Sequence, residues 1–180
     1  SFIVGAVAAV DFFTGGSHGE HVFLFTWIPG LGVEAEFLWD PLSALMTMVV
    51  TGVGSLIHLY SIGYMHGDER YPRFFAYLNL FLASMLILVL GANFAVLFVG
   101  WELVGLSSYL LISFWFEKPS AAAAGKKAFI VNRIGDFGFI IALMLIFATF
   151  GSLGFEYVFE HAHDLLDENG TTVTVITLLL

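Results

Sequence analysis

Four long, mostly apolar stretches follow one another along this chain and constrain its folding more than any other feature. They cover residues 40–62, 74–90, 94–116 and 121–150. An α-helix rises ~1.5 Å per residue, so about 20 such residues cross the ~30 Å hydrocarbon core of a bilayer. The sequence therefore predicts four membrane-spanning helices.

The composition supports a membrane protein and excludes several other classes. Of the 180 residues, 59% are hydrophobic and 12% are charged, and the mean hydropathy is +0.91. A soluble domain carries roughly a quarter charged residues, so one small core cannot hide this apolar excess. Six Lys and Arg against fifteen Asp and Glu leave no basic patch for nucleic acid. The chain has no cysteine, which rules out disulfides and thiolate metal sites, and we expect neither a metal nor a cofactor in it.

The two ends carry shorter apolar runs. Residues 1–10 and 173–180 are apolar but too short to span a bilayer, and we interpret them as truncated helices. Asp40-Pro41 is typical of a helix start, with Asp as the N-cap and Pro in the first turn. No linker divides residues 1–180, so we expect a single all-α domain, a polytopic transmembrane helix bundle.

The basic residues of the loops predict the orientation of the chain. The loops at 11–39 and 151–172 contain no Lys or Arg, whereas the loops at 63–73 and 117–127 contain five of the six. Alternation of the spans places these two basic loops on one side of the membrane. The positive-inside rule makes that side cytoplasmic.

Three ionisable residues fall inside predicted spans: Glu102, Arg133 and Asp136. A charge at the centre of a membrane helix costs roughly 2.5–3.5 kcal/mol, so such residues usually face the bundle interior and serve a pathway or a partner. All three lie about 18–22 Å of helical rise from the basic end. Glu102 has no cation three or four residues away in its own helix, so it requires a partner from another helix or must be protonated. Arg133 and Asp136, three residues apart, form either a structural ion pair or part of a pathway.

Polar side chains also form stripes on these helices. Helical projection places Lys126 on the same arc as Arg133 and Asp136, and Tyr109 on the same stripe as Glu102. His58 ends a stripe of small and polar residues on the first span. Each stripe is either a packing surface or a proton path, and His58 is either a hydrogen-bonded interior histidine or a proton carrier. The candidate pathway residues are therefore Glu102, Lys126, Arg133, Asp136, His58 and Tyr109.

Three segments resemble one known family. They are DPLSALMTMVVTGVGSLIHLYSIGYM at 40–65, FFAYLNLFLASMLILVL at 74–90 and GWELVGLSSYLLISFWFEKPSAAAAGKKAFIVNRIGDFGF at 100–139. They are similar to the L-type (chain 5) antiporter-like membrane subunit of respiratory complex I, the proton-pumping NADH:quinone oxidoreductase. Leu103 stands where Gly is common in this family, and Ser107 where Cys is common. The rival is the A-type subunit of multisubunit sodium/proton antiporters, whose usual pattern lacks the Arg-x-Gly-Asp of residues 133–136.

The resemblance implies a fragment of an antiporter-like fold with inverted repeats. It implies that Glu102 is the carboxylate of a proton channel, and that its partner lysine lies just beyond Leu180. NADH, flavin, Fe–S clusters and quinone are expected in partner subunits, with no redox chemistry in this chain. The expected partners are the lipid bilayer and other complex I membrane subunits. We expect a bacterial plasma membrane rather than a mitochondrial inner membrane.

Overall fold

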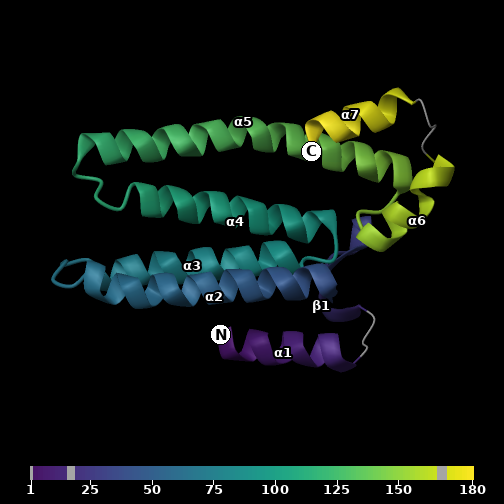
Figure 1. Cartoon of the computed structure of the whole chain (residues 1–180). Coiled ribbons are helices and arrows are strands. Elements are labelled where there is room, and N and C mark those ends of the chain that lie inside the picture. The colour runs from purple at the N-terminus through teal and green to yellow at the C-terminus, as the bar shows by residue number, and fades with distance from the viewer. Residues whose placement is uncertain (1, 16–18, 166–169) are drawn as a thin grey trace.

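A row of antiparallel helices makes up most of the molecule (Figure 1). The computed structural model describes residues 2–15, 19–165 and 170–180. In chain order the described elements are α1 (Phe2–Gly15), β1 (Glu20–Ile28), a 3-10 turn (Pro29–Leu31), β2 (Val33–Trp39), α2 (Pro41–Tyr64), α3 (Tyr71–Leu90), α4 (Phe94–Ile112), α5 (Pro119–Phe150), α6 (Phe155–Leu165) and α7 (Thr171–Leu179). Helices that follow one another in the row pack together, from α1 on α2 to α7 on α5.

Helices α2, α3, α4 and α5 are each long and apolar enough to cross a membrane. They correspond to the four predicted spans, although their ends differ by a few residues. The largest difference is in α4, for which the apolar run predicts an end at residue 116, whereas the helix ends at Ile112. Trp115 and Glu117, which follow the helix, contact the α2–α3 loop, and hydropathy carries no signal for such a contact.

The start of α2 follows the sequence prediction in atomic detail. The Asp40 carboxylate accepts a hydrogen bond of 2.7 Å from the Ser43 backbone N–H, and the Ser43 hydroxyl accepts one of 2.7 Å from the Asp40 N–H. This reciprocal capping box satisfies two backbone donors that the first turn of a helix otherwise leaves free. Pro41 occupies the first helical position, where its missing N–H has no consequence.

Small residues set the distances between neighbouring helices. A Cβ atom on Gly100 of α4 would lie 2.5 Å from the backbone nitrogen of Leu88 in α3, and one on Gly125 of α5 would lie 2.7 Å from the Ser113 Cβ. Backbone and side chain at these points are too close for any larger residue. Close approach at small residues is the usual basis of helix packing in membranes, where no hydrophobic driving force acts between helices.

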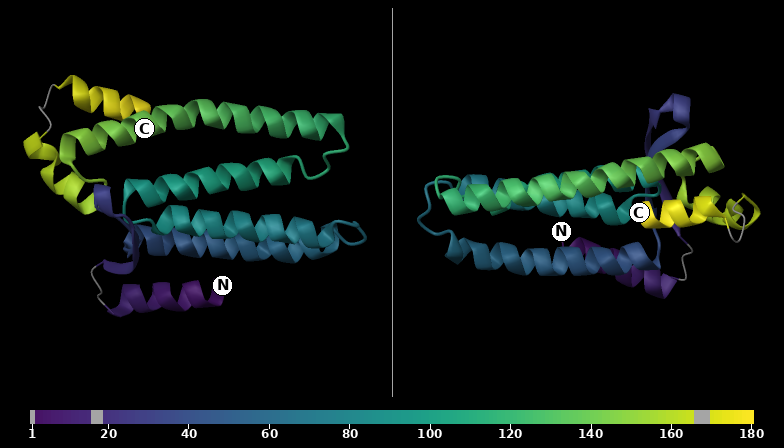
Figure 2. Two further views of the ribbon diagram at one scale, coloured as in Figure 1. Left: turned by 180° about the vertical axis from the view of Figure 1, so that it is seen from behind. Right: turned by 90° about the horizontal axis from the view of Figure 1, so that it is seen from above.

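A β-hairpin departs from the all-α prediction. Strands β1 and β2 lie within residues 11–39, which the sequence predicts to be a loop. They pair antiparallel, and their register shifts at two points in β1. Polar and apolar residues alternate at the start of Val33–Trp39, which is typical of a strand, whereas long apolar runs indicate only the spans. The hairpin lies at the end of the row opposite the α2–α3 and α4–α5 loops (Figure 2).

Asn93 joins the hairpin to the helices at this end. Its side-chain amide donates to the Glu34 carbonyl at 2.8 Å, and its side-chain oxygen caps α4 by accepting from the Val96 N–H at 2.9 Å. Helix α6 lies within the predicted loop at 151–172, and it is too short to have been found as a span. The Phe94 N–H, donating to the Leu153 carbonyl at 3.0 Å, holds the turn before α6 against the start of α4.

Candidate functional site

Arg133 lies between two carboxylates at the contact of α4 with α5, about midway along α5. One of its terminal nitrogens donates to Oε2 of Glu102 in α4, and its Nε lies 3.1 Å from Oδ2 of Asp136. The second contact is an ion pair without hydrogen-bond geometry. The structure thus brings together three of the candidate residues, and we call Glu102, Arg133 and Asp136 the charge cluster.

Trp101 holds the second carboxylate of the cluster. Its indole N–H donates to Oδ1 of Asp136 at 2.7 Å. The indole is stacked on Phe139 at 6.0 Å between ring centroids, and Phe139 is stacked on Phe98 at 5.4 Å. Asp136 is buried, with a residue exposure of 4%. A buried carboxylate is tolerated only where donors or cations compensate it, and Trp101 and Arg133 together provide this compensation.

Two neighbours shape the space that the Arg133 guanidinium occupies. The guanidinium carbon lies 4.8 Å from the centre of the Phe129 ring, within the range of a cation–π contact. A Cβ on Gly105 of α4 would come within 3.3 Å of a terminal nitrogen of Arg133. The glycine therefore leaves room for the guanidinium at the α4–α5 contact.

The formal charges of the cluster do not balance. One guanidinium faces two carboxylates, so the cluster carries a net charge of −1 when both carboxylates are ionised. An excess charge inside a bilayer is costly, and a proton or a second cation removes it. A cavity of about 610 Å³ borders the cluster, and its polar lining includes Ser108, Asn132, Arg133 and Asp136.

Tyr109 and Lys126 are placed differently relative to the cluster. The Tyr109 ring lies 5.4 Å from the ring of Phe129, which itself contacts Arg133. Tyr109 is therefore connected to the cluster through one aromatic side chain. Lys126 is exposed near the start of α5, about 10 Å of helical rise before Arg133. Among the described residues no contact joins Lys126 to Glu102.

His58 is bound between α2 and α3 rather than at the cluster. Its Nδ1 lies 2.7 Å from the Gly54 carbonyl, and its Nε2 lies 3.2 Å from the side-chain oxygen of Asn79 in α3. A neutral imidazole can donate through only one of its nitrogens. Both nitrogens of His58 thus face oxygen acceptors on α2 and α3, and its role as an interior histidine or as a proton carrier remains a prediction.

Two hydroxyls of the polar stripe on α2 bond within the helix, whereas the buried Thr47 hydroxyl has no hydrogen-bond partner in the described part of the chain. The Thr51 hydroxyl donates to the Thr47 carbonyl at 2.6 Å, and the Ser55 hydroxyl donates to the Thr51 carbonyl at 2.7 Å. Gly5 of α1 lies against Thr47 and Thr51, because a Cβ on this glycine would be 3.4 Å from each side chain. Part of the stripe therefore packs against α1.

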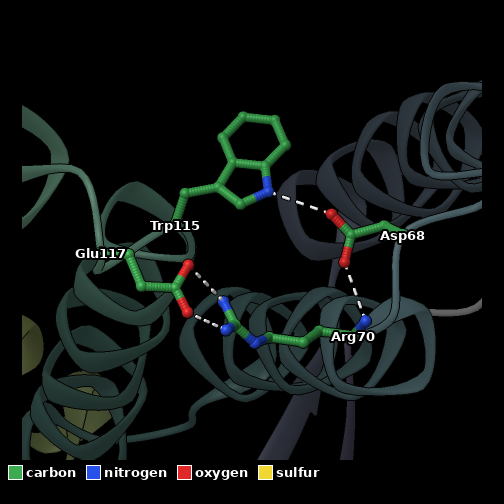
Figure 3. Close-up of polar contacts among 4 residues, drawn as sticks. All are labelled: Asp68, Arg70, Trp115 and Glu117. Atoms are coloured by element: carbon green, nitrogen blue, oxygen red, sulfur yellow. Dashed lines mark hydrogen bonds and ion pairs between the residues drawn. The ribbon is translucent and has the colours of Figure 1, made fainter.

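A second polar group joins the two basic loops, and we call its four residues Asp68, Arg70, Trp115 and Glu117 the loop clamp (Figure 3). The Arg70 guanidinium forms a bidentate ion pair with the Glu117 carboxylate. The Trp115 indole N–H donates to Asp68 at 3.0 Å, and the Arg70 backbone N–H donates to the same carboxylate at 2.8 Å. The clamp thereby ties the α2–α3 loop to the α4–α5 loop.

The clamp favours the charged forms of its residues. The hydrogen bonds from Trp115 and from the Arg70 backbone hold the pKa of Asp68 below its ordinary value. The Arg70 guanidinium lowers the pKa of Glu117, and Glu117 in turn raises the pKa of Arg70. Both carboxylates are therefore ionised at neutral pH.

Sequence analysis alone missed Trp101, Gly105 and the loop clamp. Trp101 carried a usable signal, because an indole N–H in an apolar span requires an acceptor, and Asp136 was an available one. Gly105 lies one turn after Glu102, which is a position where a neighbouring helix can approach. Asp68 and Glu117 lie 49 residues apart in sequence, and no local pattern indicated that they share one cluster.

Two family models match this chain. The model described as "NADH-Ubiquinone oxidoreductase (complex I), chain 5 N-terminus" matches residues 25–75. The model described as "NADH:quinone oxidoreductase/Mrp antiporter, TM" matches residues 91–180.

Curated relatives carry related names. The chain is 52% identical over 163 residues to "NADH-quinone oxidoreductase subunit L" of Mycobacterium tuberculosis, covering 88% of the chain and 26% of the relative. It is 50% identical over 157 residues to "NAD(P)H-quinone oxidoreductase subunit 5, chloroplastic" of Zygnema circumcarinatum, covering 86% of the chain and 22% of the relative. The chain therefore spans about a quarter of the length of these relatives.

Solved structures share the fold. A chain in the structure of the Mrp complex from Dietzia sp. DQ12-45-1b matches with a TM-score of 0.79 at 26% identity, over 99% of this chain and 19% of that one. A chain of the archaeal membrane-bound sulfane sulfur reductase matches with a TM-score of 0.83 at 22% identity, over 99% of this chain and 35% of that one. These matches confirm the antiporter-like, multi-pass membrane fold. Because one family model covers residues 91–180, half of the sequence, the chain belongs to the NADH:quinone oxidoreductase/Mrp antiporter transmembrane family.

Proposed function

We propose that this chain is part of a proton-translocating membrane subunit of NADH:quinone oxidoreductase. The observation that carries the proposal is the charge cluster, in which Arg133 lies between Glu102 and Asp136 inside the helical row. Ionisable residues at this depth are costly and usually serve an ion pathway. The names of the curated relatives favour the oxidoreductase over other members of the family.

The proposed mechanism is electrostatic. A cation close to Glu102 stabilises its carboxylate, and a weaker contact allows the carboxyl group to take up a proton. Arg133 is the cation that contacts Glu102 within this chain, and a lysine from a later helix of the subunit is the second one that the mechanism requires. When the contact of Glu102 changes from Arg133 to the lysine, the excess negative charge of the cluster changes position.

The proton enters from the end of the row that carries Lys126, in this proposal. That end is the cytoplasmic side, since it carries the basic loops. Tyr109, whose ring contacts Phe129, is the proposed intermediate of the path from Lys126 toward Glu102. NADH oxidation, flavin, Fe–S and quinone chemistry belong to partner subunits, and this chain performs no redox step. The membrane is a bacterial plasma membrane, in keeping with the Mycobacterium relative.

A sodium/proton antiporter subunit is the second candidate, because a chain of an Mrp complex shares the fold. Its identity to this chain is 26%, against 52% for the subunit L relative. The two candidates differ in their energy source. Translocation that requires NADH oxidation supports the oxidoreductase, and translocation driven by a sodium gradient alone supports the antiporter.

The test is Glu102→Gln in the full-length subunit of an assembled complex. The amide keeps the size of the side chain and its hydrogen bonding, but it removes the charge that pairs with Arg133. We expect proton translocation per electron to be lost or sharply reduced, while the complex still assembles. Glu117→Gln is the matched control, since Glu117 also pairs with an arginine but lies in an exposed loop. Wild-type translocation in Glu102→Gln contradicts the proposal.

A further inference from the structure

The turn between α3 and α4 lies between two other segments of the chain. Gly91 pairs antiparallel with Phe37 of β2, and Asn93 pairs antiparallel with Gly154 in the turn before α6. The segment that precedes α2, the start of α4 and the segment that follows α5 therefore meet at the hairpin end of the row (Figure 1). The chain is thus bound to two distant segments just before α4 begins.

Asn93 carries this attachment into α4. The residue is 6% exposed, and its side-chain amide donates to the Glu34 carbonyl of β2 at 2.8 Å. Its side-chain oxygen accepts from the Val96 N–H in the first turn of α4 at 2.9 Å. An N-cap requires only the acceptor oxygen. The donor half of the side chain is therefore a separate link, which joins the capped helix to the hairpin.

Packing around the turn leaves the start of α4 little freedom. A Cβ on Gly91 would lie 3.1 Å from the Leu97 backbone nitrogen, so the turn folds closely onto the first turn of the helix. The Phe94 ring meets the Phe155 ring of α6 edge to face, with 4.6 Å between the ring centroids. The start of α4 is therefore held by both the hairpin and α6.

The position of α4 along its axis matters for the charge cluster. Glu102 lies nine residues after Asn93, or ~13 Å of helical rise. Two polar contacts cross from α4 to α5 at this level, from Glu102 to Arg133 and from Trp101 to Asp136. A slip of α4 by one residue moves its side chains ~1.5 Å along the axis. Such a slip lengthens and misaligns both contacts, whose strength depends on distance and angle.

We propose that Asn93 is a positioning residue that sets the height of Glu102 against Arg133, because it ties the first turn of α4 to the hairpin. The inference rests on the proposed function and adds a residue that acts on the cluster from the hairpin end of the row. Loss of the amide donor releases the first turn of α4 from β2. The charge cluster keeps all of its own residues, but the helix that carries Glu102 is free to shift.

The experiment uses Asn93→Ser and Asn93→Asp in the full-length subunit within the assembled complex. Serine and aspartate are both good N-caps, so the Val96 N–H keeps an acceptor. The serine side chain is one bond shorter than that of asparagine, and an ionised aspartate has no donor for the Glu34 carbonyl. We expect wild-type assembly in both variants. Proton translocation per electron should fall about fivefold, the change in population that corresponds to the loss of one hydrogen bond.

Asp40→Ser is the matched control. The Asp40 carboxylate caps α2 by accepting from the Ser43 N–H at 2.7 Å, and in the described part of the chain its side chain bonds to no other element. Serine replaces this cap, so translocation should stay at the wild-type level. Asn93→Ala removes both the cap and the link. Loss of translocation in Asn93→Ala alone, with wild-type Asn93→Ser and Asn93→Asp, would show that only the cap matters and would overturn the inference.

A distance measurement follows the movement of α4 directly. Spin labels at Thr26→Cys on β1 and at Ile112→Cys, the last residue of α4, occupy exposed positions near opposite ends of the row. The distance between them should be narrowly distributed in the wild type and in Asp40→Ser. It should broaden in Asn93→Ser and in Asn93→Asp. A narrow distribution in both Asn93 variants overturns the inference.

The remaining outcomes separate this inference from the proposed function. The proposed function fails when Glu102→Gln translocates protons at the wild-type level. If Glu102→Gln loses translocation while both cap-preserving Asn93 variants keep it, the role of Asn93 alone is refuted. A parallel loss of assembly and translocation in both Asn93 variants also overturns the inference, because it assigns Asn93 a role in stability only.

Discussion

At the scale of single residues, Arg133 connects two helices and two carboxylates. It pairs with Glu102 on the neighbouring helix, contacts Asp136 on its own helix and covers the Phe129 ring. From the sequence, Arg133 and Asp136 form either an ion pair or part of a pathway, and the family resemblance implies a lysine beyond Leu180 as the partner of Glu102. The structure places the same arginine at both carboxylates, so the three charges form a single coupled unit.

This coupling predicts which alanine substitutions impair assembly more than others. Removing one member of a close, buried ion pair costs about 3–5 kcal/mol, because the remaining charge has no compensation. Arg133→Ala leaves two carboxylates facing each other and should impair assembly more than Asp136→Ala, which leaves Arg133 paired with Glu102. The double variant should assemble better than Arg133→Ala. A double-mutant cycle that scores assembly and proton flux separately measures the interaction.

The two readouts of this cycle separate a structural role from a pathway role. Recovery of both assembly and flux in the double variant supports a structural pair. Recovery of assembly without flux supports a pathway, and this is the result we expect. Strictly additive effects on both readouts would show that Arg133 and Asp136 do not interact.

At the scale of elements, contacts between helices and between loops hold the row together. Gly100 allows the backbones of α3 and α4 to approach closely, and the loop clamp joins the ends of the α2–α3 and α4–α5 pairs. The clamp lies outside the apolar spans, where water screens its ion pairs. We therefore expect the clamp to keep the two loops ordered and to have little effect on the insertion of the helices into the membrane.

The clamp gives a pH prediction. The pKa values of Asp68 and Glu117 are lowered from ordinary values of 3.8 and 4.5. A lowered carboxyl pKa stabilises the clamp fully above the ordinary value, and this stabilisation is lost as the pH falls through the lowered pKa. We expect the distance between spin labels at His66→Cys and Ser120→Cys to stay narrowly distributed at neutral pH and to broaden only in acid.

The same labels test which residues are responsible. Glu117→Gln should broaden the distance distribution at neutral pH, since it removes the bidentate pair with Arg70. Glu160→Gln on α6, an exposed carboxylate near the opposite end of the row, is the control and should leave the distribution narrow. A distribution that broadens between neutral pH and pH 5 in the wild type would contradict the lowered pKa values.

At the scale of the whole molecule, the two ends of the row differ in charge. The loops after α2 and α4 lie together at one end, with five of the six basic residues in or beside them. The hairpin and α6 lie at the other end, where acidic residues predominate. This separation of charge along the membrane normal is what the positive-inside rule uses to orient a chain.

Cysteine labelling tests the orientation. The chain has no cysteine, so each single substitution introduces one reporter into this part of the subunit. Ser120→Cys, exposed at the start of α5, should resist a membrane-impermeant reagent added outside intact cells, and Thr26→Cys, exposed in the hairpin, should react. Strong outside labelling of Ser120→Cys would reverse the assignment.

The sequence by itself determined the membrane class, the four long apolar helices and the capped start of α2, and it placed three ionisable residues within those helices. These features depend on local composition and helical geometry, which do not require contacts between distant parts of the chain. Family membership also followed from sequence, because the motifs around Glu102 and Arg133 are contiguous.

Only the tertiary structure decided which groups meet. The pairing of Glu102 with Arg133, the hydrogen bond from Trp101 to Asp136 and the loop clamp all join residues more than 30 positions apart. Such contacts depend on helix rotation and on the close approach that small residues such as Gly105 allow. Periodicity gives the face of each helix, but packing selects which faces touch and therefore which charged groups meet.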